Sequence, residues 1–356
     1  MKYLTQQHSA VNTTQHSSWP IHESASIDHN QAPIAQAPAM ITLQGPIDHT
    51  KLKNKSIIIT GGASGLGEAT TIIFANHGAY VTIADMAVSA GQALAQRLTD
   101  QGHHVNFIEC DTTDWSSSVR AFKHAISFAP SKTLDVAVLF AGTDGARKGL
   151  VDEVLLGPEP NLDDDPVEPV HRAIDVNLLG EYMSTSLALH YFRLQGTGPS
   201  EAQAAAPKKS LVLISSMTGY IDLPYNTDYS VSKYAIRGLF RSIRSQAHRV
   251  NARVNNVLPG YILTPLTKKV HQIEDPGEPS KATGYVLPWA PIELVVDACA
   301  RCAVDDGIDG RSLGVFPSGV VDIEEDVESG YGGKGILEVL ERDGFMDIPS
   351  LFPKKK

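Results

Sequence analysis

The sequence predicts an α/β protein built on one doubly wound parallel sheet with helices on both faces. Short β-branched runs such as residues 56–60 are typical of strands buried inside a parallel sheet. Helical stretches separate these runs at regular intervals, and a glycine cluster lies between the first strand and the first helix. This alternation favours right-handed crossover connections, which place helices on both faces of the sheet.

The expected elements follow one another in a regular order. Strands are predicted at residues 56–60, 80–85, 104–110, 134–142, 210–216, 252–260 and 312–319. Helices are predicted at residues 68–78, 86–102, 114–128, 172–192, 228–250 and 293–304. Two segments interrupt the alternation: residues 145–169 are long, acidic and proline-containing, and residues 194–210 are rich in small residues. We predict that the second of these is a surface loop.

Because all of these elements fit one sheet, we expect a single Rossmann-type domain over residues 51–320. Residues 1–50 lack steady apolar periodicity and are expected to form an irregular arm, of which residues 40–47 are the piece expected to dock. Residues 321–356 are expected to form a C-terminal extension.

The composition is that of a globular enzyme, with 42% hydrophobic and 20% charged residues. The net charge of −10 and the lack of a basic stripe argue against nucleic acid or an anionic membrane as a partner. No apolar run approaches the roughly 20 residues of a membrane span, and the N-terminus lacks a signal-peptide layout, so we expect a cytoplasmic protein. Cys110, Cys299 and Cys302 are too few for a disulfide framework, and the last two lie in an expected helix without a second ligand pair nearby. We therefore expect reduced thiols and no metal.

The glycine cluster TGGASGLG at residues 60–67 has the position of a phosphate-binding turn. Gly61, Gly65 and Gly67 would let the backbone turn tightly and approach a pyrophosphate, with Ser64 and Leu66 between them. The N-terminus of the following helix offers N–H groups and a favourable dipole. A purely structural tight turn would look similar, but the position between a buried strand and a helix favours a dinucleotide.

Asp85 ends the second strand, 18 residues after Gly67. A carboxylate there would accept hydrogen bonds from the adenosine ribose hydroxyls and repel a 2′-phosphate. Ser64 and Met86, where NADP sites commonly carry a cation, are neutral. The sequence therefore favours NAD over NADP, although a helix N-cap is a second explanation of Asp85.

Tyr229 and Lys233 are four residues apart at the start of an expected helix, so their side chains share one face. A phenol is a poor base at neutral pH, and a neighbouring ammonium favours its ionised form. Such a pair alone means little. Its context is Ser216, 13 residues earlier at the end of a strand, and Asn177 within the preceding helix.

In this order the features resemble the short-chain dehydrogenase/reductase family, over roughly residues 52–320. The resemblance is specific as a set because its parts occur in the family's order and on the expected elements. Within the family the chain looks similar to NAD-dependent enzymes such as 15-hydroxyprostaglandin dehydrogenase. The matching positions are TGxxxGxG at 60–67, Asp85, Asp111, Ala141–Gly142, Asn177, Ser216, YxxxK at 229–233 and PGxxxT at 259–264.

The resemblance implies an alcohol dehydrogenase or carbonyl reductase that acts on a CH–OH group. Tyr229 would take the hydroxyl proton of the substrate while hydride leaves the same carbon for the nicotinamide. Lys233 would favour the tyrosinate and hold the nicotinamide ribose, and Ser216 would stabilise charge on the substrate oxygen. Asn177 would hold a water that links Lys233 to solvent.

The resemblance also implies a set of cofactor contacts. Asp111 would meet the adenine amino group with Thr112 beside it, and residues 259–264 would contact the carboxamide and the phosphates. The implied contacts are Gly61, Ser64, Gly65, Leu66, Gly67, Asp85, Asp111, Thr112, Ala141, Gly142, Tyr229, Lys233, Pro259, Gly260, Ile262 and Thr264.

Taken singly, these residues also have structural explanations: Ser216 as a strand-end hydroxyl, Asn177 as a helix-interior hydrogen bonder and Asp111 as a cap. Jointly these explanations require several coincidences. One position departs from the family, because Phe140 stands where an asparagine usually precedes Ala-Gly. We expect that change to alter local packing near the adenosine end of the cleft and to leave the chemistry intact.

Two other classes of function agree less well with these residues than alcohol oxidation does. A non-catalytic NAD(P)-binding redox sensor or scaffold commonly loses the tyrosine or the lysine, and an epimerase or dehydratase needs a larger segment after Pro259. The expected partners are a small alcohol or ketone and further copies of the chain, as a homodimer or homotetramer paired through helices 172–193 and 228–250. A hydrophobic, cyclic or aromatic substrate is favoured by aromatic residues expected near the pocket, namely Tyr220, Tyr225, Tyr261, Tyr285 and Trp289.

Overall fold

The computed structural model describes residues 43, 45–146, 149–194, 208–221, 226–281, 284 and 286–323. Eight strands form one sheet in the order β10-β9-β6-β5-β4-β1-β2-β3, and all neighbours pair in parallel except β10 with β9. The strands are β1 Ser56–Thr60, β2 Tyr80–Asp85, β3 Val105–Glu109, β4 Val136–Leu139, β5 Lys209–Ile214, β6 Ala252–Pro259, β9 Ser312–Phe316 and β10 Gly319–Asp322. A separate two-stranded sheet pairs β7 Tyr261–Ile262 with β8 Trp289–Ala290.

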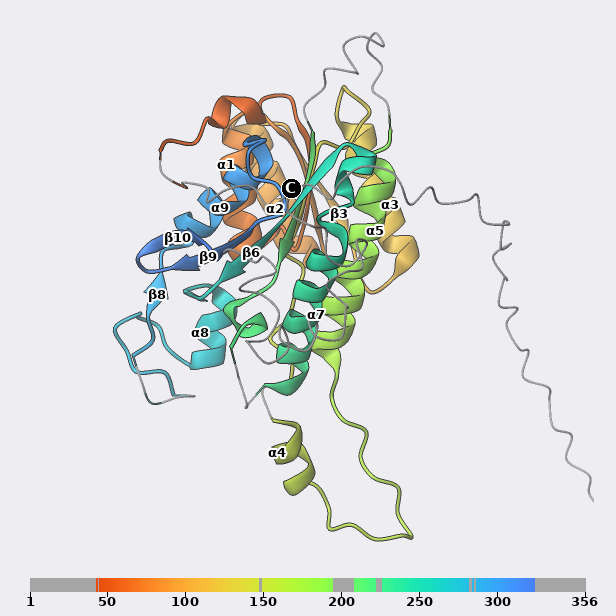
Figure 1. Ribbon diagram of the computed structural model, residues 1–356, viewed down its shortest axis with the longest axis vertical. Coiled ribbons are helices and arrows are strands. Elements are labelled where there is room, and N and C mark those ends of the chain that lie inside the picture. The colour runs from red at the N-terminus through yellow and green to blue at the C-terminus, as the bar shows by residue number, and fades with distance from the viewer. Residues whose placement is uncertain are drawn as a thin grey trace, which may run out of the picture. The chain divides into compact units, whose positions relative to one another are not determined.

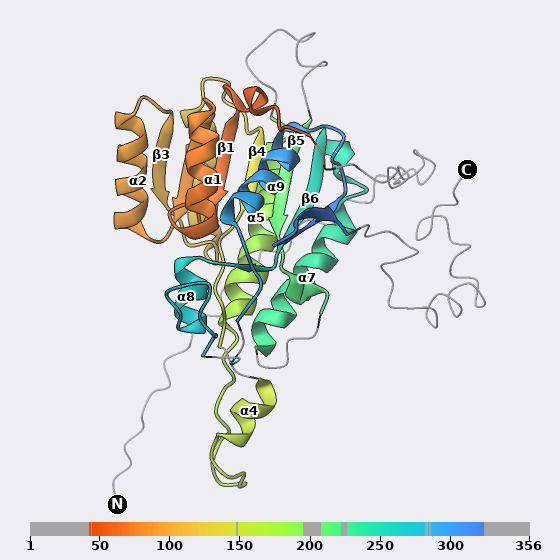
Figure 2. The same cartoon turned by 90° about the vertical axis from the view of Figure 1, so that its left-hand side faces the viewer.

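Helices cover both faces of the large sheet (Figures 1 and 2), as the sequence predicts for a doubly wound α/β fold. The first face carries α1, α2 and α9, and the second carries α3, α5 and α7. The helices are α1 Gly65–Asn76, α2 Val88–Asp100, α3 Trp115–Phe128, α4 Leu150–Leu155, α5 Glu181–Tyr191, α7 Thr227–Ile243, α8 Pro265–His271 and α9 Ile292–Val304.

The two cores follow from strand alternation. Along β1, Ile57 and Ile59 face the first core and Ile58 faces the second, because successive side chains of a strand point to opposite faces. All three are fully buried, so this strand reads as a continuous apolar run. In the segment before β1, Leu43 and Ile47 pack against the first core.

Four details differ from the sequence-based expectation. Strand β10 follows β9 and pairs with it antiparallel across a turn at residues 317–318, and Gly319, the first residue of β10, has a φ of +129°. The expected helix 228–250 ends at Ile243 and continues as a 3-10 turn at Ala247–Val250. The expected helix 172–192 begins as a π-helical segment, Ile174–Gly180. The acidic segment 145–169 contains helix α4, which lies apart from the sheet in both views.

Candidate active site

The glycine turn lies at the carboxyl end of β1, between β1 and α1. Gly61 has a φ of +67°, and a Cβ there would lie 2.7 Å from the backbone nitrogen of Ala141. A Cβ on Gly67 would overlap the carbonyl of Gly61, so this position needs glycine for the helix to start so close to the strand. Gly65 also has a positive φ, +54°. The turn therefore brings the chain close to the end of β4, where strand order reverses.

The N-terminus of α1 has the features of an anion site. The helix begins at Gly65, and its N-cap residue Ser64 makes no side-chain capping hydrogen bond. The first N–H groups of a helix have no intrahelical acceptor, so they are available to a phosphate. The side chain of Leu66 packs against the first core.

Asp85 ends β2 and joins the glycine turn to the start of α2. Its Oδ2 accepts from the backbone N–H of Ala63 at 3.0 Å, and its Oδ1 accepts from that of Ala87 at 2.9 Å. Each carboxylate oxygen has a second lone pair, so these bonds fix the carboxylate without exhausting its acceptors. Asp85 is thus held by the glycine turn, and its predicted contact with the adenosine ribose stays a prediction.

Asp111 and Thr112 follow β3 and lie at the next strand end. Asp111 Oδ1 accepts from the backbone N–H of Thr113 at 2.9 Å and from its hydroxyl at 2.7 Å, which is the capping role considered from the sequence. Thr112 is buried, and its hydroxyl lies 2.7 Å from where a Cβ of Gly180 would stand.

The segment after β6 returns to the glycine turn. Thr264 caps α8 and is buried, and its Cβ lies 3.6 Å from the position of a Cβ on Gly65. Pro259 ends β6, and Gly260 approaches the carbonyl of Val315 closely. Ile262 is 2% exposed and belongs to the first core, so its side chain serves packing.

Tyr229 and Lys233 lie in the first two turns of α7, as the spacing predicts. Tyr229 is half-buried, and the Lys233 Nζ lies 5.8 Å from the centre of its ring. Lys233 is 6% exposed, and its Nζ donates to the carbonyl of Ile214 at 2.9 Å. The ammonium is therefore anchored at the end of β5 and faces the tyrosine ring.

Asn177 links the end of β4 to the tyrosine. It is fully buried in the π-helical segment; its Oδ1 accepts from Thr143 N at 2.7 Å, and its Nδ2 donates to Thr143 O at 2.9 Å. The same Nδ2 donates to Ser232 Oγ at 3.2 Å, and Ser232 Oγ donates to Tyr229 O at 2.7 Å. Gly142 lies against Asn177, since its Cβ would stand 3.2 Å from Asn177 Oδ1.

Ser216 follows the end of β5 in extended backbone and is 8% exposed. Its Oγ accepts from the backbone N–H of Thr218 at 3.2 Å. The preceding Ser215 Oγ donates to the carbonyl of Lys233 at 2.9 Å, which ties this strand end to α7. Hydrogen bonds therefore join the segment after β5, which contains Ser216, to the helix of the Tyr–Lys pair, and join that helix to Asn177.

Two carboxyl groups at this edge were not singled out from the sequence. Asp228 is 6% exposed and accepts from the backbone N–H groups of Ala146 (3.1 Å), Ala173 (3.1 Å) and Tyr229 (2.9 Å), so it fastens both ends of the 146–173 segment beside the tyrosine. Glu181 is 3% exposed, and burial raises its pKa to about 8 against the opposing effects of Lys233 and the Ile214 N–H. The four-residue spacing from Asn177 was the available signal for Glu181.

The aromatic residues expected in the pocket make packing contacts. Tyr261 and Trp289 meet edge to face with ring centres 5.8 Å apart, and both contact His271. Tyr220 lies under the Arg237 guanidinium, 4.0 Å from its ring centre. Tyr225 and Tyr285 lie outside the described residues. A hydrophobic substrate pocket stays a prediction.

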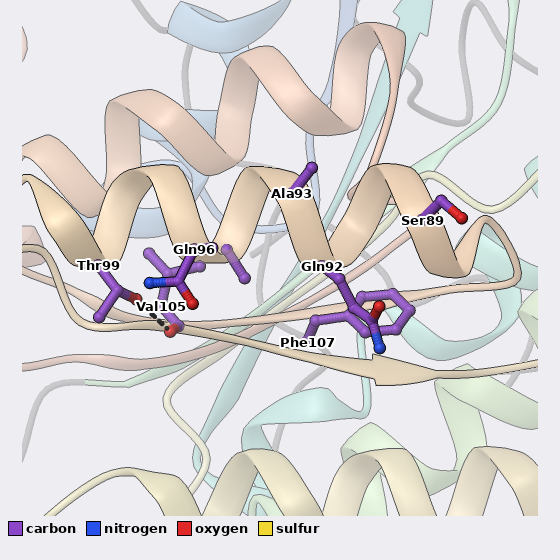
Figure 3. Close-up of a pocket in the computed structure, with 8 residues that line it drawn as sticks. Ser89, Gln92, Ala93, Gln96, Thr99, Val105 and Phe107 are labelled. Atoms are coloured by element: carbon purple, nitrogen blue, oxygen red, sulfur yellow. Dashed lines mark hydrogen bonds between the residues drawn. The ribbon is translucent and has the colours of Figure 1, made fainter.

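A hollow elsewhere on the surface carries no titratable group. It lies between α2 and β3 and is lined by residues such as Gln92, Thr99 and Phe107 (Figure 3). Within the described ranges, no three or more His, Cys, Asp or Glu side chains gather to hold a metal ion. In the same part of the chain, no helix has both the length and the apolar composition of a membrane span.

Comparison with known proteins agrees with this arrangement. The family model described as short chain dehydrogenase matches residues 55–275. The chain is similar to a 5'-hydroxyaverantin dehydrogenase of Dothistroma septosporum, with 40% identity over 85% of this chain and 97% of that protein. It is also similar to a 5'-hydroxyaverantin dehydrogenase of Emericella nidulans, with 38% identity over 83% of this chain and 95% of the relative. An NADP-dependent dehydrogenase of a Phoma species is 30% identical over 77% of this chain and 78% of its own length.

A solved structure has the same architecture. A 3-hydroxyacyl-CoA dehydrogenase type-2 from Mycobacterium avium aligns with a TM-score of 0.57 and 25% identity, covering 75% of this chain and 96% of the other. The relatives are dehydrogenases, which supports oxidoreductase activity with a nicotinamide cofactor and a small-molecule substrate. The chain belongs to the short-chain dehydrogenase family.

Proposed function

We propose that this protein is an NAD-dependent dehydrogenase that oxidises a secondary alcohol to a ketone, with Tyr229 as its acid/base. The observation that carries the proposal is the linked set at the end of β5. Lys233 lies 5.8 Å from the Tyr229 ring, and Asn177 reaches the same turn of α7 through Ser232. These groups converge at the carboxyl edge of a parallel sheet, where such folds bind their ligands.

The residues present fit a dinucleotide. The glycine turn leaves no room for a Cβ at Gly61 or Gly67, and the uncapped N-terminus of α1 opens beside it. A pyrophosphate would meet the N–H groups of this helix end, while Thr264 and Gly260 would hold the nicotinamide end. The bound nicotinamide supplies a hydride acceptor.

The protein's own groups supply the proton chemistry. Tyr229 removes the hydroxyl proton of the substrate, and the Lys233 ammonium stabilises the tyrosinate that this requires. Ser216 donates to the substrate oxygen and fixes the reacting carbon relative to the tyrosine. Asn177 holds the turn of α7 in which Tyr229 and Lys233 sit.

Asp85 supports NAD in preference to NADP. Its carboxylate is fixed by the N–H groups of Ala63 and Ala87 at the end of β2. In this position it would accept the ribose hydroxyls and repel a 2′-phosphate. The neighbouring Met86, 61% exposed, offers no compensating cation.

The relatives named for 5'-hydroxyaverantin make that compound the first substrate to test. Helices α5 and α7 each expose apolar or aromatic side chains, which supports pairing of these helices between subunits of a homodimer or homotetramer. These side chains are Leu179, just before α5, and Tyr182, Val231 and Tyr234. The three described thiols are free and buried, which fits a reducing cytoplasm.

The test is Tyr229→Phe assayed with NAD and 5'-hydroxyaverantin. Loss of the proton acceptor should lower kcat by about 10²–10⁴-fold, while NAD binding, followed by titration calorimetry, should be retained. Tyr191→Phe is the matched control, because Tyr191 is likewise a half-buried tyrosine but stacks on Phe122 of α3. Wild-type turnover in Tyr229→Phe contradicts the mechanism. Tight NAD binding without turnover in the wild type, across a panel of alcohols and ketones, favours a non-catalytic sensor.

A further inference from the structure

Strand β5 extends beyond its neighbour β4, and two side chains occupy the place that β4 leaves. The last β4–β5 pair is Leu139 with Leu213. Ser210 N donates toward β4, to Asp135 O, so every second residue from Ser210 onward, including Ile214, faces the same side. Ile214 therefore turns its N–H and C=O toward a strand that has already ended.

Glu181 and Lys233 satisfy these two groups. Glu181 Oε1 accepts from Ile214 N at 3.0 Å, and Lys233 Nζ donates to Ile214 O at 2.9 Å. The other side of β5 is still paired, since Ser215 N donates to Val257 O at 3.0 Å. The Glu181 carboxyl and the Lys233 ammonium therefore both bind Ile214, the residue of β5 that extends past the end of β4.

The Glu181 carboxyl is buried, although only one of its two oxygens is hydrogen-bonded to a described residue. Glu181 is 3% exposed, and no described residue is hydrogen-bonded to its second oxygen, Oε2. A buried carboxyl that only satisfied Ile214 N–H could be replaced by a neutral amide at lower desolvation cost. The positive charge of Lys233 lowers the pKa of the Glu181 carboxyl and so opposes the effect of burial.

We infer that Glu181 is a positioning residue for Lys233: both side chains are anchored on Ile214, and the ionised carboxyl supplies a counter-charge beside the ammonium. This inference rests on the proposed role of Lys233 in catalysis. Burial raises the pKa of Glu181 to about 8, so the carboxyl is neutral near pH 7 and becomes an anion above pH 8. An adjacent anion stabilises an ammonium, so the alkaline form of the site places a counter-charge next to Lys233.

The first experiment compares the pH profiles of kcat/KM for NAD-dependent oxidation of 5'-hydroxyaverantin. Glu181→Gln keeps an oxygen that can accept from Ile214 N–H and removes only the ionisable group. We expect equal rates near pH 6–7 and an alkaline limb displaced to lower pH by about one unit. An alkaline limb at the wild-type pH shows that Glu181 is structural and overturns the inference.

The second experiment does not depend on turnover or on the substrate. In the cofactor-free protein, the infrared carbonyl band of a protonated carboxyl at pH 6–10 reports on Glu181, because ordinary carboxyls are ionised there. Lys233→Met removes the opposing charge, so the midpoint of this band should rise by about one pH unit or more. An unchanged midpoint overturns the inference even where Glu181→Gln fails to fold.

Asp135→Asn is the matched control for both experiments. Asp135 is also partly buried and pairs with a lysine, Lys209, but it precedes β4 at the opposite edge of the sheet. Neither the alkaline limb nor the infrared midpoint should move in this variant. If Tyr229→Phe keeps its activity, the proposed function is wrong. The infrared titration tests the coupling of Glu181 to Lys233 separately, because it needs no turnover.

Discussion

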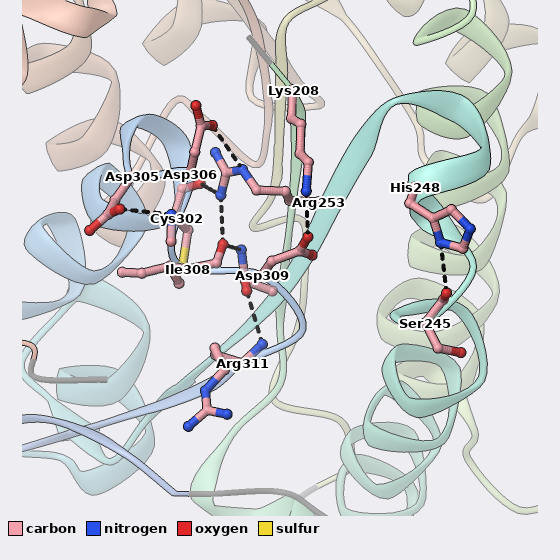
Figure 4. A network of polar contacts seen from close by, with 12 residues as sticks. Lys208, Ser245, His248, Arg253, Cys302, Asp305, Asp306, Ile308, Asp309 and Arg311 are labelled. Carbon is pink, nitrogen blue, oxygen red and sulfur yellow. Dashed lines mark hydrogen bonds and ion pairs between the residues drawn. The ribbon is translucent and has the colours of Figure 1, made fainter. Parts of the chain in front are cut away.

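The two ends of the sheet bury cations in different ways. At the amino end, Arg253 of β6 is fully buried, and its guanidinium donates to the carbonyls of Cys302 (2.8 Å) and Ile308 (2.7 Å) (Figure 4). Its Nε lies 3.3 Å from Asp306 Oδ1, an ion pair without hydrogen-bond alignment. Lys209 lies 2.6 Å from Asp135 at the same end.

At the carboxyl end, the buried cation has fewer hydrogen-bond acceptors. Lys233 donates to a single backbone carbonyl among the described contacts, that of Ile214. Its neighbour Glu181 retains a buried oxygen that is hydrogen-bonded to none of the described residues. Such an arrangement costs stability, and natural proteins keep it mainly where a group must titrate or meet a ligand. The amino end therefore uses charge for structure, whereas the carboxyl end keeps charge available for chemistry.

Arg253→Met should give the largest change in stability. Removing the guanidinium deletes two buried, charge-assisted hydrogen bonds, although the carbonyls of Cys302 and Ile308 each keep one other donor, Ser210 Oγ and Asn255 Nδ2. We therefore expect unfolding in guanidinium chloride to show a loss of about 3–5 kcal/mol. The folded fraction should keep wild-type kcat. Lys233→Met is the matched variant and should reverse the pattern, with lost turnover and a smaller change in stability. Equal losses of stability in the two variants would contradict the proposed difference between the ends of the sheet.

Glu181→Gln should change stability in a pH-dependent way. The folded pKa of Glu181, about 8, lies above the ordinary value of 4.5, so between these values the unfolded chain gives up a proton that the folded chain keeps. Wild-type stability therefore falls as pH rises through this window and levels off above pH 8. The glutamine variant lacks this loss, so its stability relative to wild type should rise by a few kcal/mol from pH 5 to 8. A difference that is constant with pH, measured by chemical unfolding, contradicts the buried carboxyl.

Much of the fold and of the candidate site follows from short stretches of sequence. β-branched runs predict the buried strands, and the glycine spacing predicts a turn whose Gly61 does adopt a positive φ. The spacing of Tyr229 and Lys233 predicts a shared helix face, and the ring and ammonium do face each other. These features are local, because each depends on residues within one or two turns of the chain.

The features that were missed depend on tertiary context. Glu181 matters because β4 ends one pair before Ile214, and nothing local to residue 181 encodes where β4 stops. Asp228 bonds to Ala146 and Ala173, which lie far from it in sequence. The apparent helix 228–250 has helical periodicity throughout, but Asn251 takes a left-handed conformation (φ +53°) to lead into β6.

Substitution of Asp85 should give the smallest effect of these variants. It is a carboxylate at the chemical end of the sheet, yet both of its oxygens have backbone donors, from Ala63 and Ala87. Asp85→Asn removes its charge, and therefore its repulsion of a 2′-phosphate, so the ratio of kcat/KM for NAD over NADP should fall about tenfold. Asp111→Asn is the control, because Asp111 also ends a strand region and accepts backbone bonds, but should meet the adenine that both cofactors share. An unchanged ratio in Asp85→Asn assigns Asp85 to the structural carboxylates, with Asp135.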